Sequence, residues 1–324
     1  MESVDNILMN LEVDSSTIEL EHRFNKYVIY HYTSPLGLKG IVKENGCATL
    51  WFTQYNSLND ISERKDLLNF VHGYCDFRVK ENKFSNKFSS LVKAIKLDDE
   101  ILVTVKGAPY NGIETSSLLR EQSDTYLCCF SQHDDLLAMW HYYSKSSRYE
   151  GYSIGFKRPN FSDGYNKGYH LSICKVIYEN NQKVQILDKF LLPLAQIYEK
   201  TNPEQQSRIS CIIHQLFNQL QFLFKDEHFY HEQEVRAILR IPRQFREKGI
   251  VIEGKQEVSP RTYRIANGIF VPYVELNLPQ HSLYTIKIAP LLERDLAINN
   301  LKDMLHFLGH PSVDVLPSNI PIRF

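Results

Sequence analysis

The chain has 324 residues, with 37 Lys or Arg against 38 Asp or Glu and a formal net charge of −1. Hydrophobic residues make up 43% of it and aromatic residues 12%, which is enough apolar surface to exclude a disordered protein. The near-zero charge excludes a polybasic nucleic-acid binder whose affinity rests on many phosphate contacts, while a local basic groove stays compatible with it.

Membrane segments and export signals are missing from the sequence pattern. No stretch reaches the roughly 18 apolar residues that cross a bilayer, and the acidic start lacks the charged and apolar regions of a signal peptide. The six cysteines form no CxxC pair, so we expect them to be reduced. These features predict a cytoplasmic protein without a membrane partner.

The first elements have clear start and stop signals. Residues 1–26 carry apolar residues at roughly helical spacing and predict an N-terminal helical segment. Residues 28–33 are rich in β-branched and aromatic side chains and predict a strand. A helix follows between Pro35 and Gly46, because proline favours helix starts and glycine helix ends. Residues 49–53 predict a second strand.

The rest of the chain mixes strands and helices at irregular intervals. Further strands are predicted at 124–131, 151–156, 171–178, 234–241, 268–276, 282–288 and 312–316, and helices at 62–95, 136–143, 182–226 (two helices broken near 202–203) and 291–308. A regular βαβ array is therefore unexpected. We predict an α+β fold with a mixed, largely antiparallel sheet, forming a single domain over 27–324 with helical insertions at about 62–121 and 182–226.

The familiar chemical motifs are missing. The sequence contains no GxxxxGK[ST] or GxGxxG loop for phosphates, and no HExxH or GxSxG motif of the common hydrolases. Any site must therefore be found from smaller groups of polar and aromatic residues.

The first such group lies at the end of the first predicted strand. Alternation along a strand puts His31 and Thr33 on one face and Tyr32 on the other. A neutral imidazole facing a cleft can hydrogen-bond a ligand hydroxyl, and Thr33 adds a second polar group. The alternative is structural: both are hydrogen-bonded strand residues, and Ser34 caps the next helix.

The second group surrounds the second predicted strand. The ring of Trp51 could stack on a planar ligand, and Thr53 and Asn59 are polar candidates for contacting it. Asp60 and Glu63 fit a capping box for the helix that follows, so we assign Asp60 a structural role.

A third group combines carboxylates with a guanidinium. In an extended strand Glu232, Glu234 and Arg236 would share one face. Such a row can raise the pKa of one carboxylate or hold an ionised carboxylate against a developing cation. The alternative is a solvated polar face with an ion pair, but the apolar run that follows favours a central strand.

Two further groups have weaker chemical meaning. His228 and His231, three residues apart, could bind a metal together with Glu232, although no third histidine or cysteine cluster accompanies them. Seven aromatic residues fall between 130 and 156, dense enough for a pocket wall or for core packing, and Trp140 and Tyr143 belong to this run.

These stretches together resemble an uncharacterised prokaryotic family, a domain of unknown function, with the pattern YHYTS…LWFT…LND…CFS…MW…IGF…ExEVR. The matching residues are Tyr30–Ser34, Leu38, Ile41, Leu50–Thr53, Leu58–Asp60, Glu63, Cys129–Ser131, Met139–Trp140, Gly151, Ile154–Phe156 and Glu232–Arg236. The ending from Ser318 to Arg323 is also similar, so the resemblance spans about 27–324. This resemblance does not imply an activity.

A second likeness concerns mechanism. The strand–helix–strand opening with His-x-Thr at the strand end is similar to ADP-ribosyltransferases, in particular the DarT-like toxins that modify DNA. This likeness implies a split β core, NAD as the substrate, His31 against the nicotinamide-side ribose, and Glu234 with Glu232 as the catalytic carboxylates. The residues expected to bind the substrate are Tyr32, Thr33, Trp51, Thr53, Asn59, Ser131, Trp140, Tyr143 and Arg236.

The chemistry of that reaction suits these residues. Cleavage of the nicotinamide–ribose bond passes through an oxocarbenium-like cation, which a fixed carboxylate stabilises. We therefore expect an ADP-ribosyltransferase-like enzyme that cleaves NAD, without a metal, and transfers ADP-ribose to a macromolecule, as a toxin or anti-phage defence effector. The alternatives are a metal-dependent nuclease or hydrolase, and a non-catalytic module that senses a nucleotide or binds a protein.

Overall fold

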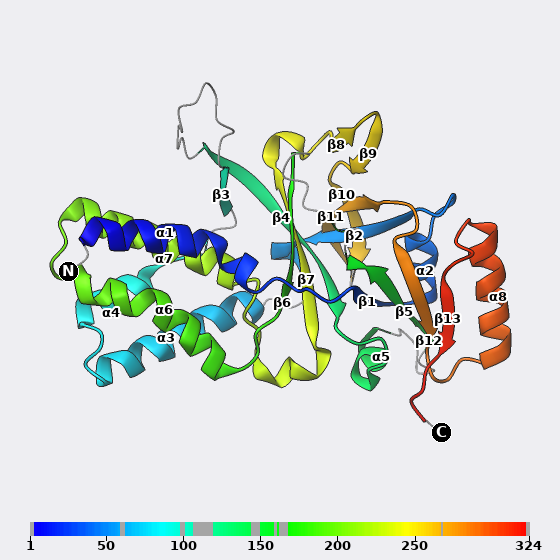
Figure 1. Ribbon diagram of the computed structural model, residues 1–324, viewed down its shortest axis with the longest axis horizontal. Coiled ribbons are helices and arrows are strands. Elements are labelled where there is room, and N and C mark those ends of the chain that lie inside the picture. The colour runs from blue at the N-terminus through cyan, green and yellow to red at the C-terminus, as the bar shows by residue number, and fades with distance from the viewer. Residues whose placement is uncertain are drawn as a thin grey trace. The chain divides into compact units, whose positions relative to one another are not determined.

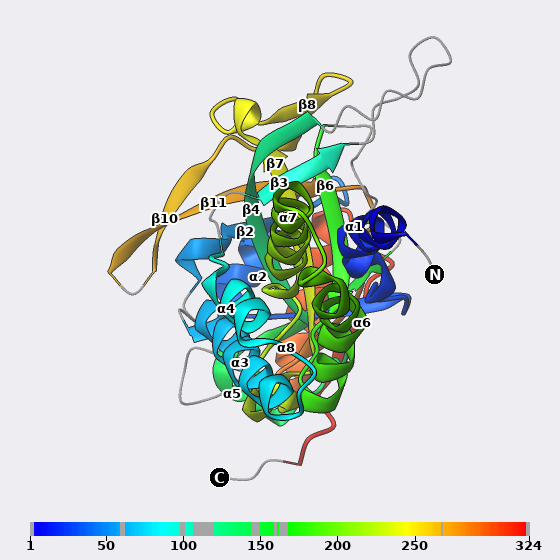
Figure 2. The same cartoon turned by 90° about the vertical axis from the view of Figure 1, so that its left-hand side faces the viewer.

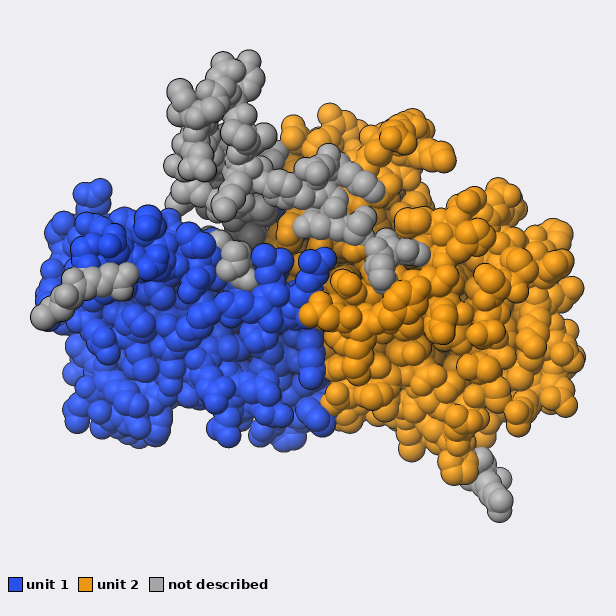
Figure 3. Space-filling view, in the orientation of Figure 1, with its two compact units in different colours: residues 1–23, 58–123, 174–230 blue, residues 24–57, 124–173, 231–324 orange. Residues whose placement is uncertain are grey.

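A computed structural model of the chain describes residues 3–58, 62–97, 101–105, 119–143, 150–158, 161, 168–266 and 268–321. The chain divides into two compact units (Figure 3). Unit 1 comprises residues 1–23, 58–123 and 174–230, and unit 2 comprises 24–57, 124–173 and 231–324. The predicted N-terminal segment and the two predicted insertions together make up most of unit 1, so these three separate stretches form one compact body.

Unit 1 is mainly helical. Its elements are α1 (Val4–Glu21), α3 (Ser62–Lys80), α4 (Asn86–Ala94), α6 (Asn180–Tyr198), α7 (Pro203–Leu220) and β3 (Ile101–Val105), which pairs with residues 119–123 of β4. Helix α1 packs on α6 and α7, and α3 packs on α4 (Figure 2). Their facing sides bury large apolar residues, including Leu67, Phe88, Leu187, Phe190, Ile213 and Phe217. In the ranges that the structure describes, no helix is long and apolar enough to span a membrane.

The break between α6 and α7 follows directly from local sequence. Asn202 caps α7 by accepting a hydrogen bond from the backbone of Gln205, and the Gln205 side chain accepts one from the backbone of Asn202. Pro203 stands at the first helical position, where its missing N–H costs nothing. This capping box explains why the predicted interruption at 202–203 is present in the structure.

Unit 2 holds most of the strands. They are β1 (Val28–Thr33), β2 (Ala48–Gln54), β4 (Leu119–Ser131), β5 (Tyr152–Lys157), β6 (His170–Lys175), β7 (Glu234–Pro242), β8 (Ile250–Ile252), β9 (Lys255–Val258), β10 (Thr262–Ala266), β11 (Ile269–Leu278), β12 (Leu283–Ile288) and β13 (Asp314–Pro317). Three helices accompany them: α2 (Pro35–Ile41), α5 (Leu137–Tyr143) and α8 (Arg294–Phe307). The predicted α+β class is confirmed.

The strands pair in a mixed, largely antiparallel sheet, as predicted. One series runs β13-β12-β5-β1-β4, and from β4 a second runs β2-β11-β9-β8, with β10 beside β11 and β7 joining β4 to β6. Antiparallel registers join β1 to β5 and β5 to β12, whereas β12 and β13 are parallel (Figure 1). Apolar side chains of both series form one core, with Phe52, Phe130, Phe156, Val235 and Leu276 among its members.

The sheet divides along one edge of β4. Leu127 is the register partner of Thr53 in β2, whereas Ser131 is the partner of Tyr30 in β1. Strand β4 pairs with β7 on its opposite edge. The backbone groups of successive residues point to opposite edges of a strand, and the N–H of Gln132, which follows Ser131, donates to the carbonyl of Gln233 just before β7. Strands β2 and β1 therefore pair with successive parts of the same edge of β4, and a short stretch of β4 separates the two pairings.

Candidate functional site

His31 lies at the point where the sheet divides. Its Nδ1 donates to the carbonyl of Cys129 at 2.9 Å, and its ring packs edge-on against Phe130 at 5.6 Å. In β4, Cys129 is midway between Leu127, which pairs with β2, and Ser131, which pairs with β1. In a continuous sheet the carbonyl of Cys129 would accept from the N–H of a neighbouring strand, whereas here it accepts from the side chain of His31.

The environment keeps His31 neutral. Burial lowers the pKa of its imidazole; the Cys129 carbonyl opposes this effect, and the charge of Arg264 adds to it. Because Nδ1 carries the proton that binds Cys129, the lone pair of the neutral ring is on Nε2. The site thus offers a hydrogen-bond acceptor to which a ligand hydroxyl could donate.

A second part of the site lies on β2 and the β10–β11 hairpin. Trp51 stacks on Tyr273 with ring centroids 4.7 Å apart, and the guanidinium of Arg264 lies over the Trp51 ring at 5.8 Å. Arg264 also donates to the hydroxyl of Thr53 at 3.0 Å. The antiparallel registers put these four residues on one face, because Tyr273 is the partner of Thr53. With 41% of its surface exposed, Trp51 can still receive a ligand.

The predicted row of carboxylates is only partly correct. Strand β7 begins at Glu234, and Glu232 ends a 3-10 turn before it. Gln233 between them has a left-handed backbone, with φ of 47°, so the three residues do not form one extended row. Glu234 and Arg236 do share a face, as alternation requires.

Glu234 and Arg236 form a buried, two-pronged ion pair. The Nε of Arg236 donates to Oε1 of Glu234 at 2.9 Å, and NH2 donates to Oε2 at 3.2 Å. Only 4% of Glu234 and 1% of Arg236 is exposed. Paired in this way, the Glu234 carboxylate is held in a fixed orientation.

Ser131 connects β4 to the segment that precedes β7. Its Oγ donates to the carbonyl of Glu232 at 2.9 Å and accepts from the backbone N–H of His133 at 3.3 Å. Ser131 is fully buried, so its hydroxyl here holds the two segments together. This position differs from the open, ligand-facing one that the resemblance implies for it.

Other predicted binding residues lie elsewhere in unit 2. Tyr32 and Trp140 pack against each other in a small apolar cluster, with ring centroids 4.9 Å apart, and both side chains are buried. Thr33 is half-buried at the end of β1, and Tyr143 is exposed at the end of α5. Asn59, by contrast, lies outside the described residues.

Asp135 anchors the loop after β4 to the C-terminal segment. Its carboxylate accepts from Nε1 of Trp140 at 2.8 Å, from Oγ of Ser318 at 2.6 Å and from the N–H of Asn319 at 2.7 Å. Burial alone would raise the pKa of Asp135, but these hydrogen bonds and the charge of Lys287 outweigh it and hold the pKa below its usual range. The segment at Ser318 and Asn319 is thus held to the loop after β4 by Asp135.

The Asp135 anchor predicts a pH-dependent difference in stability. An acid with a lowered folded-state pKa stabilises the fold above its unfolded pKa, about 3.9, and this contribution is lost as the pH falls through the folded value. Urea denaturation should therefore show Asp135→Asn less stable than wild type at pH 7, with the difference shrinking below about pH 4. A difference that is unchanged down to pH 3 would contradict the assignment.

The two histidines considered for a metal have other partners in the structure. Nδ1 of His228 pairs with Asp226 at 2.5 Å, and Nε2 of His231 is 3.0 Å from the hydroxyl of Tyr142. Within the part of the chain that the structure describes, no group of three or more His, Cys, Asp or Glu residues could hold a metal ion.

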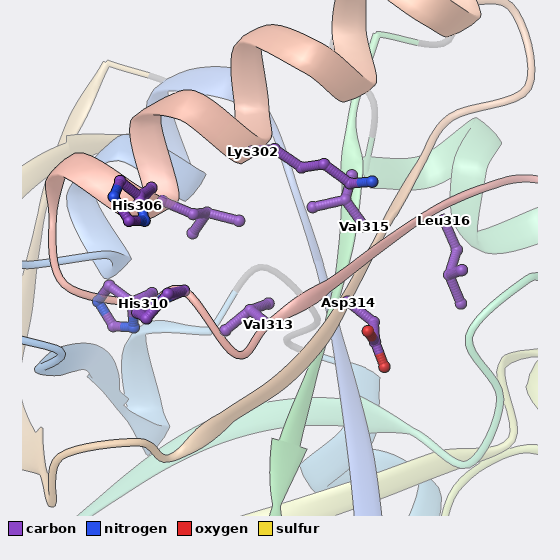
Figure 4. A pocket seen from close by; sticks show the side chains of 9 residues that line it. Lys302, His306, His310, Val313, Asp314, Val315 and Leu316 are labelled. Atoms are coloured by element: carbon purple, nitrogen blue, oxygen red, sulfur yellow. The ribbon is translucent and has the colours of Figure 1, made fainter.

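A separate pocket of about 520 Å³ lies between α8 and β13 (Figure 4). It is lined by Lys302, Leu305, His306, His310, Pro311, Val313, Asp314, Val315 and Leu316. His310 is buried there, and its Nε2 donates to the carbonyl of Lys43 at 2.9 Å. None of the predicted site residues lines this pocket.

Fold and site together define an α+β protein with a divided, largely antiparallel sheet and a neutral histidine at the division. Residues 139–237, from α5 into β7, match the model of a family described as protein of unknown function (DUF2971). The predicted resemblance to an uncharacterised domain family is confirmed over this segment, which is shorter than the 27–324 expected. No curated protein and no solved structure matches the chain.

Proposed function

We propose that unit 2 is an ADP-ribosyltransferase-like enzyme that binds NAD beside the division of the sheet and cleaves its nicotinamide–ribose bond. The observation that carries the proposal is the neutral His31, which fills the gap between β1 and β2 by donating to Cys129. A divided β core with a histidine on its first strand is what the likeness to that superfamily implies.

The residues suit the chemistry that the reaction needs. Nε2 of His31 can accept a ribose hydroxyl, and the exposed ring of Trp51 can stack on a planar ring of the substrate. A fixed carboxylate stabilises the cationic transition state, and the proposal assigns this role to Glu234, whose orientation Arg236 holds. Glu232, two residues before Glu234 in the chain, is the second carboxylate in the proposal.

The experiment is direct. Purified protein incubated with NAD and a lysate of bacterial cells should release free nicotinamide and label an acceptor with ADP-ribose. Addition of a metal chelator should leave the rate unchanged, because no residue of the proposed site acts through a metal. Binding of NAD without any release would show a non-catalytic nucleotide sensor instead, and a rate that disappears with the chelator would favour the metal-dependent alternative.

We place this activity in the cytoplasm, where NAD is available. All six cysteines are free thiols, which suits a reducing compartment. The acceptor of ADP-ribose is a macromolecule, and a toxin or anti-phage defence effector is the role in which such a transfer has an evident use. The net charge of −1 does not favour nucleic acid as that acceptor.

A further inference from the structure

Arg264 is a cation that the proposed chemistry does not yet use. It lies on β10, half-buried, with its guanidinium between the hydroxyl of Thr53 and the ring of Trp51. Among the described residues no carboxylate lies within ion-pair distance of it, and its buried Nε has no hydrogen-bond partner. Other partly or wholly buried arginines, such as Arg78, Arg236 and Arg246, are paired with a carboxylate.

An arrangement of this kind has a cost that a ligand can remove. A buried N–H donor without an acceptor loses its hydration and gains nothing in return. An anion that met the guanidinium would satisfy Nε and neutralise the charge at once, and guanidinium binds phosphate oxygens in a two-pronged geometry. Arg264 is also near enough to His31 for its charge to add to the effect of burial, which lowers the pKa of that imidazole.

The surroundings indicate the kind of anion. Trp51 offers an exposed indole surface next to the guanidinium, with Tyr273 stacked behind it. A ligand with both a planar ring and a phosphate would stack on Trp51 while its phosphate met Arg264, whereas inorganic phosphate would use only the second contact. Glu275 is the register partner of Trp51, and in the part of the chain that the structure describes no ion pair joins it to Arg264.

We infer that Arg264, with Thr53 and the exposed ring of Trp51, forms a subsite for the phosphate of a nucleotide. The subsite adds to the proposed function by naming the residue that would hold the phosphates of NAD. That NAD is the nucleotide rests on the proposed function. The anion contact itself rests only on the surroundings of Arg264.

The test measures affinity for three probes by isothermal titration calorimetry: ADP, adenosine and inorganic pyrophosphate. Wild-type protein should bind ADP about 10- to 100-fold more tightly than adenosine, and pyrophosphate should displace ADP. In Arg264→Gln the affinity for ADP should fall to that for adenosine, with adenosine binding unchanged. Arg261→Gln is the matched control, because Arg261 stands near the same strand but lies over Tyr263 at 5.7 Å.

The outcomes separate this inference from the proposed function. Equal affinity of wild type for ADP and adenosine, or full ADP affinity in Arg264→Gln, would overturn the phosphate subsite even if NAD is cleaved. An Arg264-dependent preference for ADP without nicotinamide release would support the subsite and contradict the transferase. Because displacement of ADP by pyrophosphate is measured on wild type, the inference stays testable if the variant fails to fold.

Discussion

Replacing His31 with alanine is expected to lower nicotinamide release from NAD by about 100-fold or more. The imidazole supplies the acceptor that we assign to the ribose, and it also fills the gap between β1 and β2 by binding Cys129. The rate of nicotinamide release is measured by chromatography for wild type and variant at saturating and at limiting NAD. The two conditions separate a loss in kcat from a change in KM.

Two controls distinguish a chemical role for His31 from a structural one. His31→Asn keeps an N–H donor near the position of Nδ1, so it should restore the fold without restoring activity. His72→Ala removes an exposed histidine of α3 and should leave the rate unchanged. Because the pKa of His31 is lowered, wild-type kcat/KM should stay level from pH 8 to below 6.5 and fall only as His31 is protonated. Full activity in His31→Asn would contradict the assignment.

Breaking the buried ion pair is expected to have the largest effect on stability. Arg236→Met removes the partner of a carboxylate that is almost fully buried, so the unfolding free energy should fall by about 3–5 kcal/mol. Urea denaturation followed by circular dichroism measures this difference directly.

The pair also provides its own control. A double variant, Glu234→Leu with Arg236→Met, removes both charges and should recover most of the lost stability, although it cannot be active in our proposal. Lys189→Met, which breaks an exposed ion pair with Glu21 in unit 1, should cost less than about 1 kcal/mol. An Arg236→Met protein as stable as Lys189→Met would show that the buried pair contributes little.

The elements with strong local signals could be predicted from the sequence. Strand β1 has the predicted range, and helix α2 begins at Pro35 as predicted, because Ser34 caps the helix through Gly37 and Pro35 fixes its first turn; the helix ends at Ile41, before the predicted stop at Gly46. Strand β10 was missed, since its five residues show no buried apolar side. It is held in place by pairing with β11, a contact that no local pattern announces.

Only those parts of the site that depend on residues close together in the sequence could be predicted. Alternation correctly put Glu234 and Arg236 on one face, but it failed at Gln233, where a left-handed backbone interrupts the extended chain. Arg264 was missed altogether. Its contact with Trp51 requires β10 to pair with β11 and β11 with β2, so more than 200 residues of chain separate the partners.

The two units are interleaved along the chain, which limits how each unit can be produced. Each is assembled from three stretches, and unit 2 lacks β7, β11 and β12 until synthesis has passed residue 288. Neither unit can therefore be expressed as one continuous fragment, and during translation the early strand β1 must wait for partners made much later. The segment 139–237 that matches the family model includes residues of both units.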